Sequence, residues 1–280
     1  MMSFLAVWRA PTPMVDQERL DSDLARRGLA RSRSHAAQLI REGVVQVDGI
    51  PATKVSQRVA ASARVEVIGD HGYVSRGALK LLAALDAFAV SVTSRIALDA
   101  GASTGGFTQV LLERGAQRVI AVDVGHGQLD ASLAQDRRLL SCEGVNVRAL
   151  TANQLAGLVG EPVRPDLVVA DLSFISLTQV IAALREVAQP LADFVLLVKP
   201  QFEVGRGGIR EGIVRDARLR REALSAVLWT GFDVGLGVAG VIPSPIAGSH
   251  GNREYLVHLS ERGTNPGDWL DTVDRITATG

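Results

Sequence analysis

The sequence predicts an α/β protein in which a mostly parallel sheet carries helices on both faces, preceded by a small α+β unit. Two observations predict the sheet. From Ile96 onward, short apolar runs alternate with segments of helical periodicity, and several of the runs end in a polar or charged residue. A third observation separates the N-terminal unit, because positive charge is concentrated in residues 26–64. A chain of 280 residues is long enough for two domains.

Composition narrows the classes of protein to consider. The formal net charge is +0, so only local clusters of charge can point to partners. The single cysteine, Cys142, excludes an internal disulfide, suits a reducing cytosol and is expected to be a small buried side chain. No apolar run approaches the roughly 18–20 residues that a membrane helix needs. We therefore expect a cytoplasmic protein that does not cross a membrane.

Changes in composition along the chain mark the expected domains. Pro11 and Pro13 break regular structure near the start, and the stretch around residue 72 is polar and contains glycine, as linkers do. We expect a disordered extension, an α+β unit, a linker, an α/β domain and a weakly helical or loose tail, over residues 1–15, 16–68, 69–75, 76–262 and 263–280.

The α+β unit is predicted to begin with two short helices between residues 16 and 43. Gly28 and Gly43 end these helices. Strands are predicted at residues 44–47 and 65–68. Two acidic residues, Glu42 and Asp48, and eight basic residues give residues 26–64 a net charge of +6. The basic residues are Arg26, Arg27, Arg31, Arg33, Arg41, Lys54, Arg58 and Arg64. Such a cluster forms either a phosphate-binding face or a solvated helix surface.

The pattern of this unit resembles the S-four type RNA-binding domain. The resemblance covers residues 18–68 and rests on the order helix, helix, strand and on Arg31, Ser32, Gly43, Val45, Val47, Asp48 and Gly49. It implies binding to structured RNA. The RNA-contacting residues that we expect are Arg26, Arg27, Arg31, Ser32, Arg33, Arg41 and Lys54, with Arg76, Arg206 and Arg210 from the second domain.

Strands and helices alternate through the α/β domain. A first helix is expected from Ser75, which can cap it, to about Phe88, so that Lys80 projects from its first turns. Strands are predicted at residues 96–100, 118–123, 145–149, 166–171, 194–199, 236–242 and 254–259. Helices are predicted from the turn after residue 100 to residue 114, and at residues 127–135, 177–189 and 216–230.

The turn after the first strand is where sheets of this kind bind nucleotide-like ligands. Residues 99–107 read D-A-G-A-S-T-G-G-F, and Gly101, Gly105 and Gly106 permit positive φ and a close approach of a ligand. A dinucleotide fingerprint fails here, because Ser103 stands where its second glycine belongs.

A nucleophile elbow, G-x-S-x-G, does match around Ser103. His250 or His258 would have to complete a triad in the order that hydrolases use. The elbow lies on the first strand of its domain rather than in the middle of a sheet, so the match is a weak one.

The third reading of the turn is a site for S-adenosylmethionine. The glycine-rich loop suits the methionine end, and Asp123, at the end of the second strand, suits the ribose hydroxyls. The alternative is that Asp123 only caps the following turn. Asn146 or Arg148 is expected near the adenine. The candidate cofactor-binding residues are Asp99, Gly101, Ala102, Ser103, Thr104, Gly105, Gly106, Phe107, Asp123, Asn146 and Asp171.

Two lysines and two carboxylates are expected at the same edge of the sheet. Asp171 and Lys199 end strands, Lys80 lies on the preceding helix, and Glu254 opens the last strand. A lysine can be tuned to accept the proton of a ribose hydroxyl, which a guanidinium cannot do, and the carboxylates would orient that lysine. The alternative for Lys199 is a strand-end lysine whose amine reaches into solvent.

Five segments of the chain resemble the TlyA (hemolysin A) family, whose catalytic domain is similar to FtsJ-type ribose methyltransferases with a Rossmann-like sheet. The segments are residues 74–80, 99–107, 170–174, 198–203 and 251–255. The resemblance implies a catalytic K-D-K-E set at Lys80, Asp171, Lys199 and Glu254. It also implies 2′-O-methylation of cytidine in ribosomal RNA, in both subunits for some members. The chain departs from relatives at residues 71–73, which puts the behaviour of the linker in doubt.

These observations predict an S-adenosylmethionine-dependent 2′-O-methyltransferase that acts on ribosomal RNA or ribosomal subunits, with Lys199 as the base. No metal is expected, and a monomer is favoured. Two other classes stay open from the sequence. One is a non-catalytic RNA-binding or ribosome-assembly protein. The other is the membrane-active protein that the family's older name suggests, although no segment of membrane length supports it.

Overall fold

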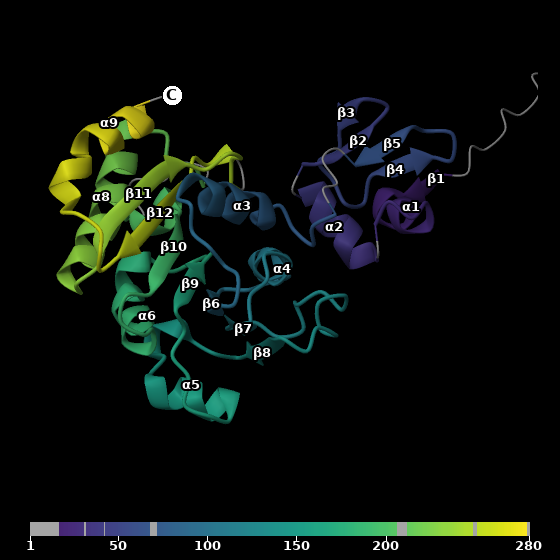
Figure 1. Cartoon of the computed structure of the whole chain (residues 1–280). Coiled ribbons are helices and arrows are strands. Elements are labelled where there is room, and N and C mark those ends of the chain that lie inside the picture. Colours follow the sequence, from purple (N-terminus) through teal and green to yellow (C-terminus); the bar gives the residue numbers. More distant parts are fainter. Residues whose placement is uncertain are drawn as a thin grey trace, which may run out of the picture. The chain divides into compact units, whose positions relative to one another are not determined.

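The computed structural model describes residues 17–30, 32–41, 43–67, 72–205, 212–248 and 251–278. The chain divides into two compact units, Met1–Gly72 and Tyr73–Gly280 (Figure 1). The extension expected at residues 1–15 lies outside the described residues. No helix in the described ranges is long and apolar enough to cross a membrane.

The first unit packs two helices on short antiparallel strands. Its helices are α1 (Leu20–Arg26) and α2 (Arg33–Arg41). Its strands are β1 (Gln17–Arg19), β2 (Val45–Val47), β3 (Ile50–Pro51), β4 (Arg58–Ala60) and β5 (Val65–Val67). β1 pairs with β4, and β2 lies between β3 and β5. The sequence predicted both helices, β2 and β5 but missed β1, β3 and β4, because strands of two or three residues carry too little periodicity to detect.

A seven-stranded sheet in the order β11-β12-β10-β9-β6-β7-β8 forms the second unit. β12 is antiparallel to both of its neighbours, and the other pairs from β10 to β8 are parallel. The strands are β6 (Ile96–Ala100), β7 (Arg118–Asp123), β8 (Leu139–Glu143), β9 (Leu167–Ala170), β10 (Asp193–Val198), β11 (Gly237–Pro243) and β12 (Tyr255–Ser260). The expected α/β fold with a mostly parallel sheet is confirmed.

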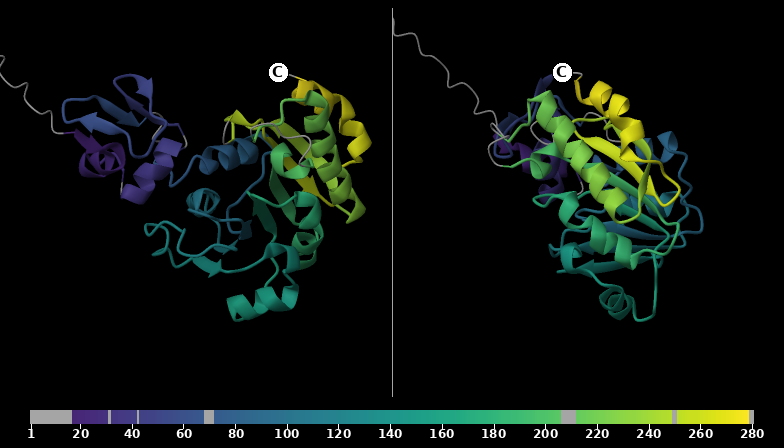
Figure 2. Two further views of the ribbon diagram at one scale, coloured as in Figure 1. Left: turned by 180° about the vertical axis from the view of Figure 1, so that it is seen from behind. Right: turned by 90° about the vertical axis from the view of Figure 1, so that its left-hand side faces the viewer.

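Helices cover both faces of this sheet (Figure 2). One face packs against α3 (Gly77–Ala87) and α4 (Gly106–Glu113). The other face packs against helices α5 (Ala152–Val159), α6 (Ile181–Val187), α8 (Ala217–Asp233) and α9 (Leu270–Ala278). A short helix, α7 (Pro200–Glu203), directly follows β10.

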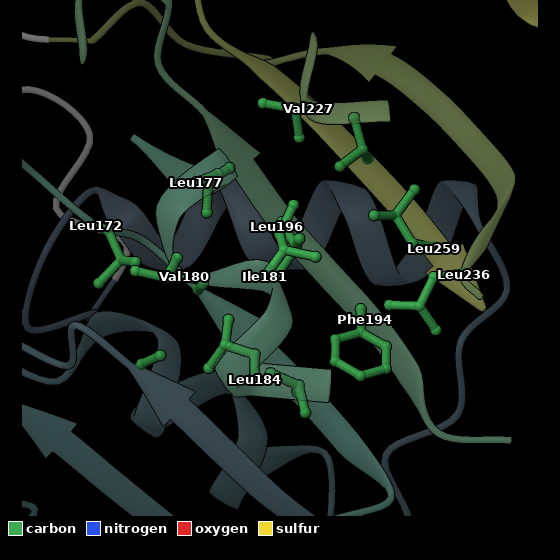
Figure 3. Packing of buried hydrophobic residues seen from close by; sticks show 14 of the residues in the cluster. Leu172, Leu177, Val180, Ile181, Leu184, Phe194, Leu196, Val227, Leu236 and Leu259 are labelled. Carbon is green, nitrogen blue, oxygen red and sulfur yellow. The ribbon is translucent and has the colours of Figure 1, made fainter. Parts of the chain in front are cut away.

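Successive side chains of the interior strand β10 pack alternately into the two halves of the core. Phe194, Leu196 and Val198 lie in the cluster under α6 and α8, whereas Val195 and Leu197 lie in the cluster under α3 and α4. Figure 3 shows the first of these clusters, in which Leu196 lies among side chains from α6, α8 and β12. The apolar run that predicted this strand is therefore buried on both faces.

Two local expectations in the second unit were wrong. No helix forms over residues 127–135, and the third strand is residues 139–143 rather than 145–149. β8 is an edge strand in which only Cys142 is buried and the other side chains are partly or fully exposed, so its apolar signal is weak. The segment that resembled a strand begins with Asn146, whose side chain accepts a hydrogen bond from the Arg148 amide and so starts a 3₁₀ turn.

Helix boundaries differ in three further places. Ser75 does not cap α3, since the N-cap is Arg76 and makes no side-chain cap bond. The helix expected over residues 177–189 is split into a 3₁₀ turn (Leu177–Gln179) and α6. The C-terminal residues form a second 3₁₀ turn (Pro266–Trp269) and α9, which packs on α8 through buried Val273. The expected tail is thus part of the second compact unit.

The close packing around β10 predicts that a cavity there strongly lowers the free energy of unfolding. Leu196 is 0% exposed, and we expect Leu196→Ala to lower the free energy of unfolding by about 2–5 kcal/mol, because the packed neighbours cannot close the space. Urea denaturation measures the change. Leu158→Ala on α5, where the side chain is 40% exposed, is the matched control and should cost under about 1 kcal/mol. Equal losses in the two variants would contradict this account.

Candidate active site

The expected catalytic residues lie where strand ends meet at one edge of the sheet. Asp171 directly follows β9, Lys199 directly follows β10, and Glu254 directly precedes β12. Val198 pairs with Tyr255 in the antiparallel register, so Lys199 and Glu254 lie just beyond the same rung of the ladder. α3 packs against β10 and β12 and brings Lys80 to this edge.

These four side chains form two ion pairs. Lys80 Nζ lies 2.5 Å from Glu254 Oε2, and their side chains are 9% and 2% exposed. Lys199 Nζ lies 2.5 Å from Asp171 Oδ1 and donates a hydrogen bond to Ser173 Oγ at 2.9 Å. Each lysine therefore has its own carboxylate, which offsets the cost of removing both charges from water.

Gln201 adds a link between the loop after β10 and the acid of the first pair. Its side chain is 9% exposed, and Nε2 donates to Glu254 Oε1 at 3.3 Å. Glu254 thus receives Lys80 on one oxygen and Gln201 on the other. The sequence did not predict this role for Gln201, although it lies in the K-P-Q-F-E segment.

The glycine-rich turn begins at a fully buried acid. Asp99 accepts a hydrogen bond from Thr108 Oγ1 at 2.6 Å, and its Oδ1 atom has no hydrogen-bond partner. Burial raises the pKa of Asp99 to about 7; the hydrogen bond from Thr108 opposes this rise, and the charge of Asp171 adds to it. Asp99 is the one member of the turn that holds an unused buried acceptor among the described residues.

Two glycines of the turn adopt the left-handed conformation, with φ of 86° at Gly101 and 95° at Gly105. Protein atoms occupy the space that their side chains would need. A Cβ on Gly101 would lie 2.8 Å from the carbonyl oxygen of Asp171, and one on Gly105 would lie 2.4 Å from Leu133. Glycine is therefore required here for the contact with neighbouring protein segments, and the close approach of a ligand to this turn stays a prediction.

Gly106 has no positive φ and begins α4. A Cβ on Gly106 would lie 2.1 Å from Ser75 Oγ, so this position also needs glycine for packing. Phe107 and Ala102 are buried at 3% and 8% exposure. Thr104 accepts a backbone hydrogen bond from Asp130 through its carbonyl oxygen.

Asp123, at the end of β7, shapes the same turn. Its Oδ2 accepts from the Ser103 amide at 2.8 Å and its Oδ1 accepts from the Gly125 amide at 2.7 Å. The capping alternative raised for Asp123 is thus part of its role. Its contact with a ribose and the contact of Asn146 with an adenine stay predictions.

The positions of these residues contradict the hydrolase interpretation. His258 pairs across the ladder with Val195, well along β12 from the catalytic edge, and its Nε2 lies 2.8 Å from Asp193 Oδ1. Ser103 Oγ donates instead to Gln128 at 3.3 Å. His250 lies outside the described residues. Ser103 is therefore a loop residue.

An exposed aromatic ring stands beside the Lys199 pair. Phe174 is 92% exposed and has a φ of 66°, which is unusual for a bulky residue. Its ring centroid lies 5.2 Å from that of Phe202, and Lys199 Nζ lies 5.9 Å from the Phe202 centroid. Both rings belong to motifs that the sequence singled out, but their pairing was not predicted.

In the first unit, the structure divides the expected RNA-contacting residues into two groups. Arg26 and Arg27 both form ion pairs with the buried carboxylate of Asp23, and Arg33 pairs with buried Asp21 at 3.0 Å. Hydrogen bonds from Arg19 and Arg33 hold the pKa of Asp21 at about 2 in spite of its burial.

Arg41 and Lys54 are exposed and make no ion pair among the described residues. Ser32 caps α2 by accepting from the His35 amide at 3.1 Å. A surface hollow of about 700 Å³ is lined by Gln17, Glu18, Arg19, Ser22, Arg26, Arg27, Arg58 and Ala61. The other predicted contacts, Arg31, Arg206 and Arg210, lie outside the described residues, and Arg76 precedes α3.

Both units are similar to known protein families. The family model of FtsJ-like methyltransferases matches residues 73–261, and that of the S4 domain matches residues 18–65. The chain is 47% identical to the 16S/23S rRNA (cytidine-2′-O)-methyltransferase TlyA of Mycobacterium tuberculosis, over 95% of this chain and 100% of that protein. It is 38% identical to Hemolysin A of Brachyspira hyodysenteriae, over 86% of this chain and 99% of that protein.

The chain is also similar to solved structures. A hemolysin structure from Streptococcus thermophilus has a TM-score of 0.73 and 37% identity, and covers 94% of this chain and 95% of its own. A hemolysin structure from Lactococcus lactis has a TM-score of 0.66 and 38% identity, and covers 71% of this chain and 97% of its own.

The buried state of Asp99 predicts a pH dependence of stability. With a pKa of about 7 in place of 3.8, the folded protein keeps a proton that the unfolded chain releases, so stability falls as pH rises through this window. We expect Asp99→Asn to remove this loss. Relative to wild type, the variant should gain up to about 4 kcal/mol of unfolding free energy between about pH 4 and pH 8.

Urea denaturation at a series of pH values measures this difference in the absence of ligands. Asp233→Asn, at an exposed residue near the end of α8, controls for the change in charge. Parallel stability curves for wild type and Asp99→Asn would contradict the prediction.

Proposed function

The chain belongs to the FtsJ-like methyltransferase family, and we propose that it transfers a methyl group from S-adenosylmethionine to the 2′-hydroxyl of a cytidine in ribosomal RNA. One observation carries the proposal. The structure holds two lysines, each paired with a carboxylate, at the edge of the sheet that also carries the glycine-rich turn. Relatives that match nearly the whole chain are named for this reaction.

The residues around the turn fit S-adenosylmethionine. The strand order reverses between β6 and β9, where open α/β sheets bind ligands. Asp99 offers a buried oxygen that has no hydrogen-bond partner in the described part of the chain, and Asp123 places a second carboxylate at the next strand end. A ligand with an ammonium group and ribose hydroxyls complements these acids. When bound, S-adenosylmethionine supplies a methyl group on a positively charged sulfur.

Lys199 is the proposed base. Its ion pair with Asp171 and its hydrogen bond to Ser173 fix the position of Nζ at the sheet edge. To act as a base, the ammonium must first release its own proton to solvent; the neutral amine, held next to the 2′-hydroxyl, then accepts the hydroxyl proton as the oxygen becomes nucleophilic. Lys80, held by Glu254, supplies a second positive charge at the same edge, where negative charge develops on that oxygen.

Phe174 is the proposed platform for the target base. An almost fully exposed ring beside the catalytic lysine can stack on a nucleobase that is not paired with another strand. Phe202 packs against the ring in a tilted arrangement, at 5.2 Å between centroids. Such a platform requires the target nucleotide to leave any helix it belongs to.

The first unit is the proposed RNA-docking domain. Its family match is to the S4 domain, and Arg41 and Lys54 present exposed charges that no carboxylate of the described residues neutralises. Arg26, Arg27 and Arg33 are engaged with Asp21 and Asp23, so phosphate binding there must compete with existing ion pairs. Arg41 and Lys54 are therefore the stronger candidates for phosphate contacts.

The base is tested by two substitutions of Lys199. Lys199→Ala removes the amine, and Lys199→Arg keeps a positive charge that can pair with Asp171 but cannot deprotonate. We expect both to lower single-turnover methylation of ribosomal RNA by at least about 100-fold, with little change in cofactor affinity by calorimetry. Mapping of ribose methylation on the RNA identifies the product.

Arg118→Ala is the matched control for the Lys199 variants. Arg118 starts β7, at the opposite end of the strands, and its ion pair with Glu161 is exposed. This variant should keep the wild-type rate. A Lys199→Arg enzyme within about threefold of wild type would rule out Lys199 as the base.

The stacking platform predicts a loss that is specific to RNA. Phe174→Ala should weaken the productive placement of the target base and lower kcat/KM for RNA by about 10-fold or more, which corresponds to one lost stacking contact. Phe174→Tyr keeps a ring and should retain most of the activity. Cofactor affinity should be the same in all three proteins. If Phe174→Ala lowers cofactor affinity instead, the ring does not act on the RNA.

A further inference from the structure

Glu203 ends α7, and its carboxylate is partly buried and pairs with no cation among the described residues. Its Oε1 accepts a hydrogen bond from the Leu177 amide at 2.9 Å, and its Oε2 accepts one from Ser176 Oγ. No lysine, arginine or histidine of the described residues forms an ion pair with it. Burial raises the pKa of Glu203, and the bonds from Ser176 and Leu177 oppose that rise. A carboxylate in this setting is held by hydrogen bonds alone.

These bonds join the two segments that carry the proposed base and its partner. Ser176 ends the stretch that begins at Asp171, after β9, and Glu203 ends the stretch that begins at Lys199, after β10. Between the same two stretches lie the ion pair of Lys199 with Asp171 and the ring contact of Phe202 with Phe174. The hydrogen bond of Lys199 to Ser173 joins them as well, and Glu203 adds a further cross-link at the end farthest from the strands.

Phe174 has a strained backbone conformation, which this cross-link must hold in place. A bulky residue at a φ of 66° is strained, and a ring that is 92% exposed gains little packing to offset the strain. Such a conformation persists only where the chain on both sides is fixed. β9 fixes the chain before Phe174, and the Glu203 bonds to Ser176 and Leu177 fix it after.

We infer that Glu203 is a positioning residue for methyl transfer, whose carboxylate locks the loop of residues 172–176 against α7 and so sets the placement of Lys199 and of the Phe174 ring. Glu203 acts through these two residues and contacts neither substrate nor cofactor. The inference rests on the proposed function, because it assigns a purpose to the placement of the base.

Three variants test the role of Glu203. Glu203→Ala removes both bonds, and we expect kcat for methylation of ribosomal RNA to fall about 10- to 100-fold, since small misplacements of catalytic groups have effects of this size. Glu203→Gln keeps an oxygen for the Leu177 amide and offers an amide donor to Ser176, and should stay within about threefold of wild type. Ser176→Ala should act like a weaker form of Glu203→Ala.

The double variant Glu203→Ala/Ser176→Ala should lose less activity than the product of the two single losses, because each single variant already removes the bond between the two side chains. Glu261→Ala is the matched control. Glu261 also accepts from a backbone amide, that of Leu191 at 3.2 Å, and pairs with Arg185, but it follows β12 at the end away from the site. This variant should keep the wild-type kcat.

The readouts separate positioning from loss of fold. In Glu203→Ala, the cofactor affinity and the urea midpoint of unfolding should change little compared with kcat. The midpoint of the pH–rate profile should shift in Glu203→Ala and should not shift in Glu203→Gln. An unchanged kcat and pH–rate profile in Glu203→Ala, or a loss of activity that only follows the unfolded fraction, would overturn the inference. If the Lys199 variants stay active, the proposed function fails on its own, whatever the result at Glu203.

Discussion

The active edge of this protein depends on pairing each of two lysines with its own carboxylate. Lys80 and Glu254 are almost completely withdrawn from water, and a lone charge in that place would be costly. Their pairing requires α3 to pack across β10 and β12, which lie far from it in sequence. The pair of Lys199 with Asp171 in turn requires β9 and β10 to be neighbours. The sheet order is therefore what makes the chemistry of the site possible.

One antiparallel strand completes the site. In the parallel part of the sheet, the carboxyl ends of β6, β9 and β10 supply Asp99, Asp171 and Lys199. A further parallel strand would bring only its carboxyl end to this edge. Because β12 runs the opposite way, the residue before its start, Glu254, reaches the edge instead. Gln201 then ties that acid to the loop of Lys199.

The acids at the edge differ in their roles because their surroundings differ. Asp99 has a single donor, Thr108, and burial raises its pKa to about 7. Asp123 receives two backbone amides and shapes the turn. Asp171 faces a lysine. Glu203 receives an amide and a hydroxyl and joins two loops. The strained Phe174 lies in one of these loops, where its exposed ring contacts Phe202, the ring that lies near Lys199.

The sequence by itself determined the alternation of strands and helices, the strands that are buried on both faces, and the residues that end them, because long apolar runs and polar strand ends are local signals. It did not reveal the edge strand β8 or the 3₁₀ turn at Asn146, where local hydrogen bonds outweigh the apolar pattern. Only the tertiary structure decided which carboxylate serves which lysine, since Lys80 and Glu254 are 174 residues apart. It also decided that Arg26, Arg27 and Arg33 are held by Asp21 and Asp23, and that the glycines of the turn make room for protein atoms. Pairings between distant segments follow from the packing of the whole sheet, and no local pattern in the chain encodes them.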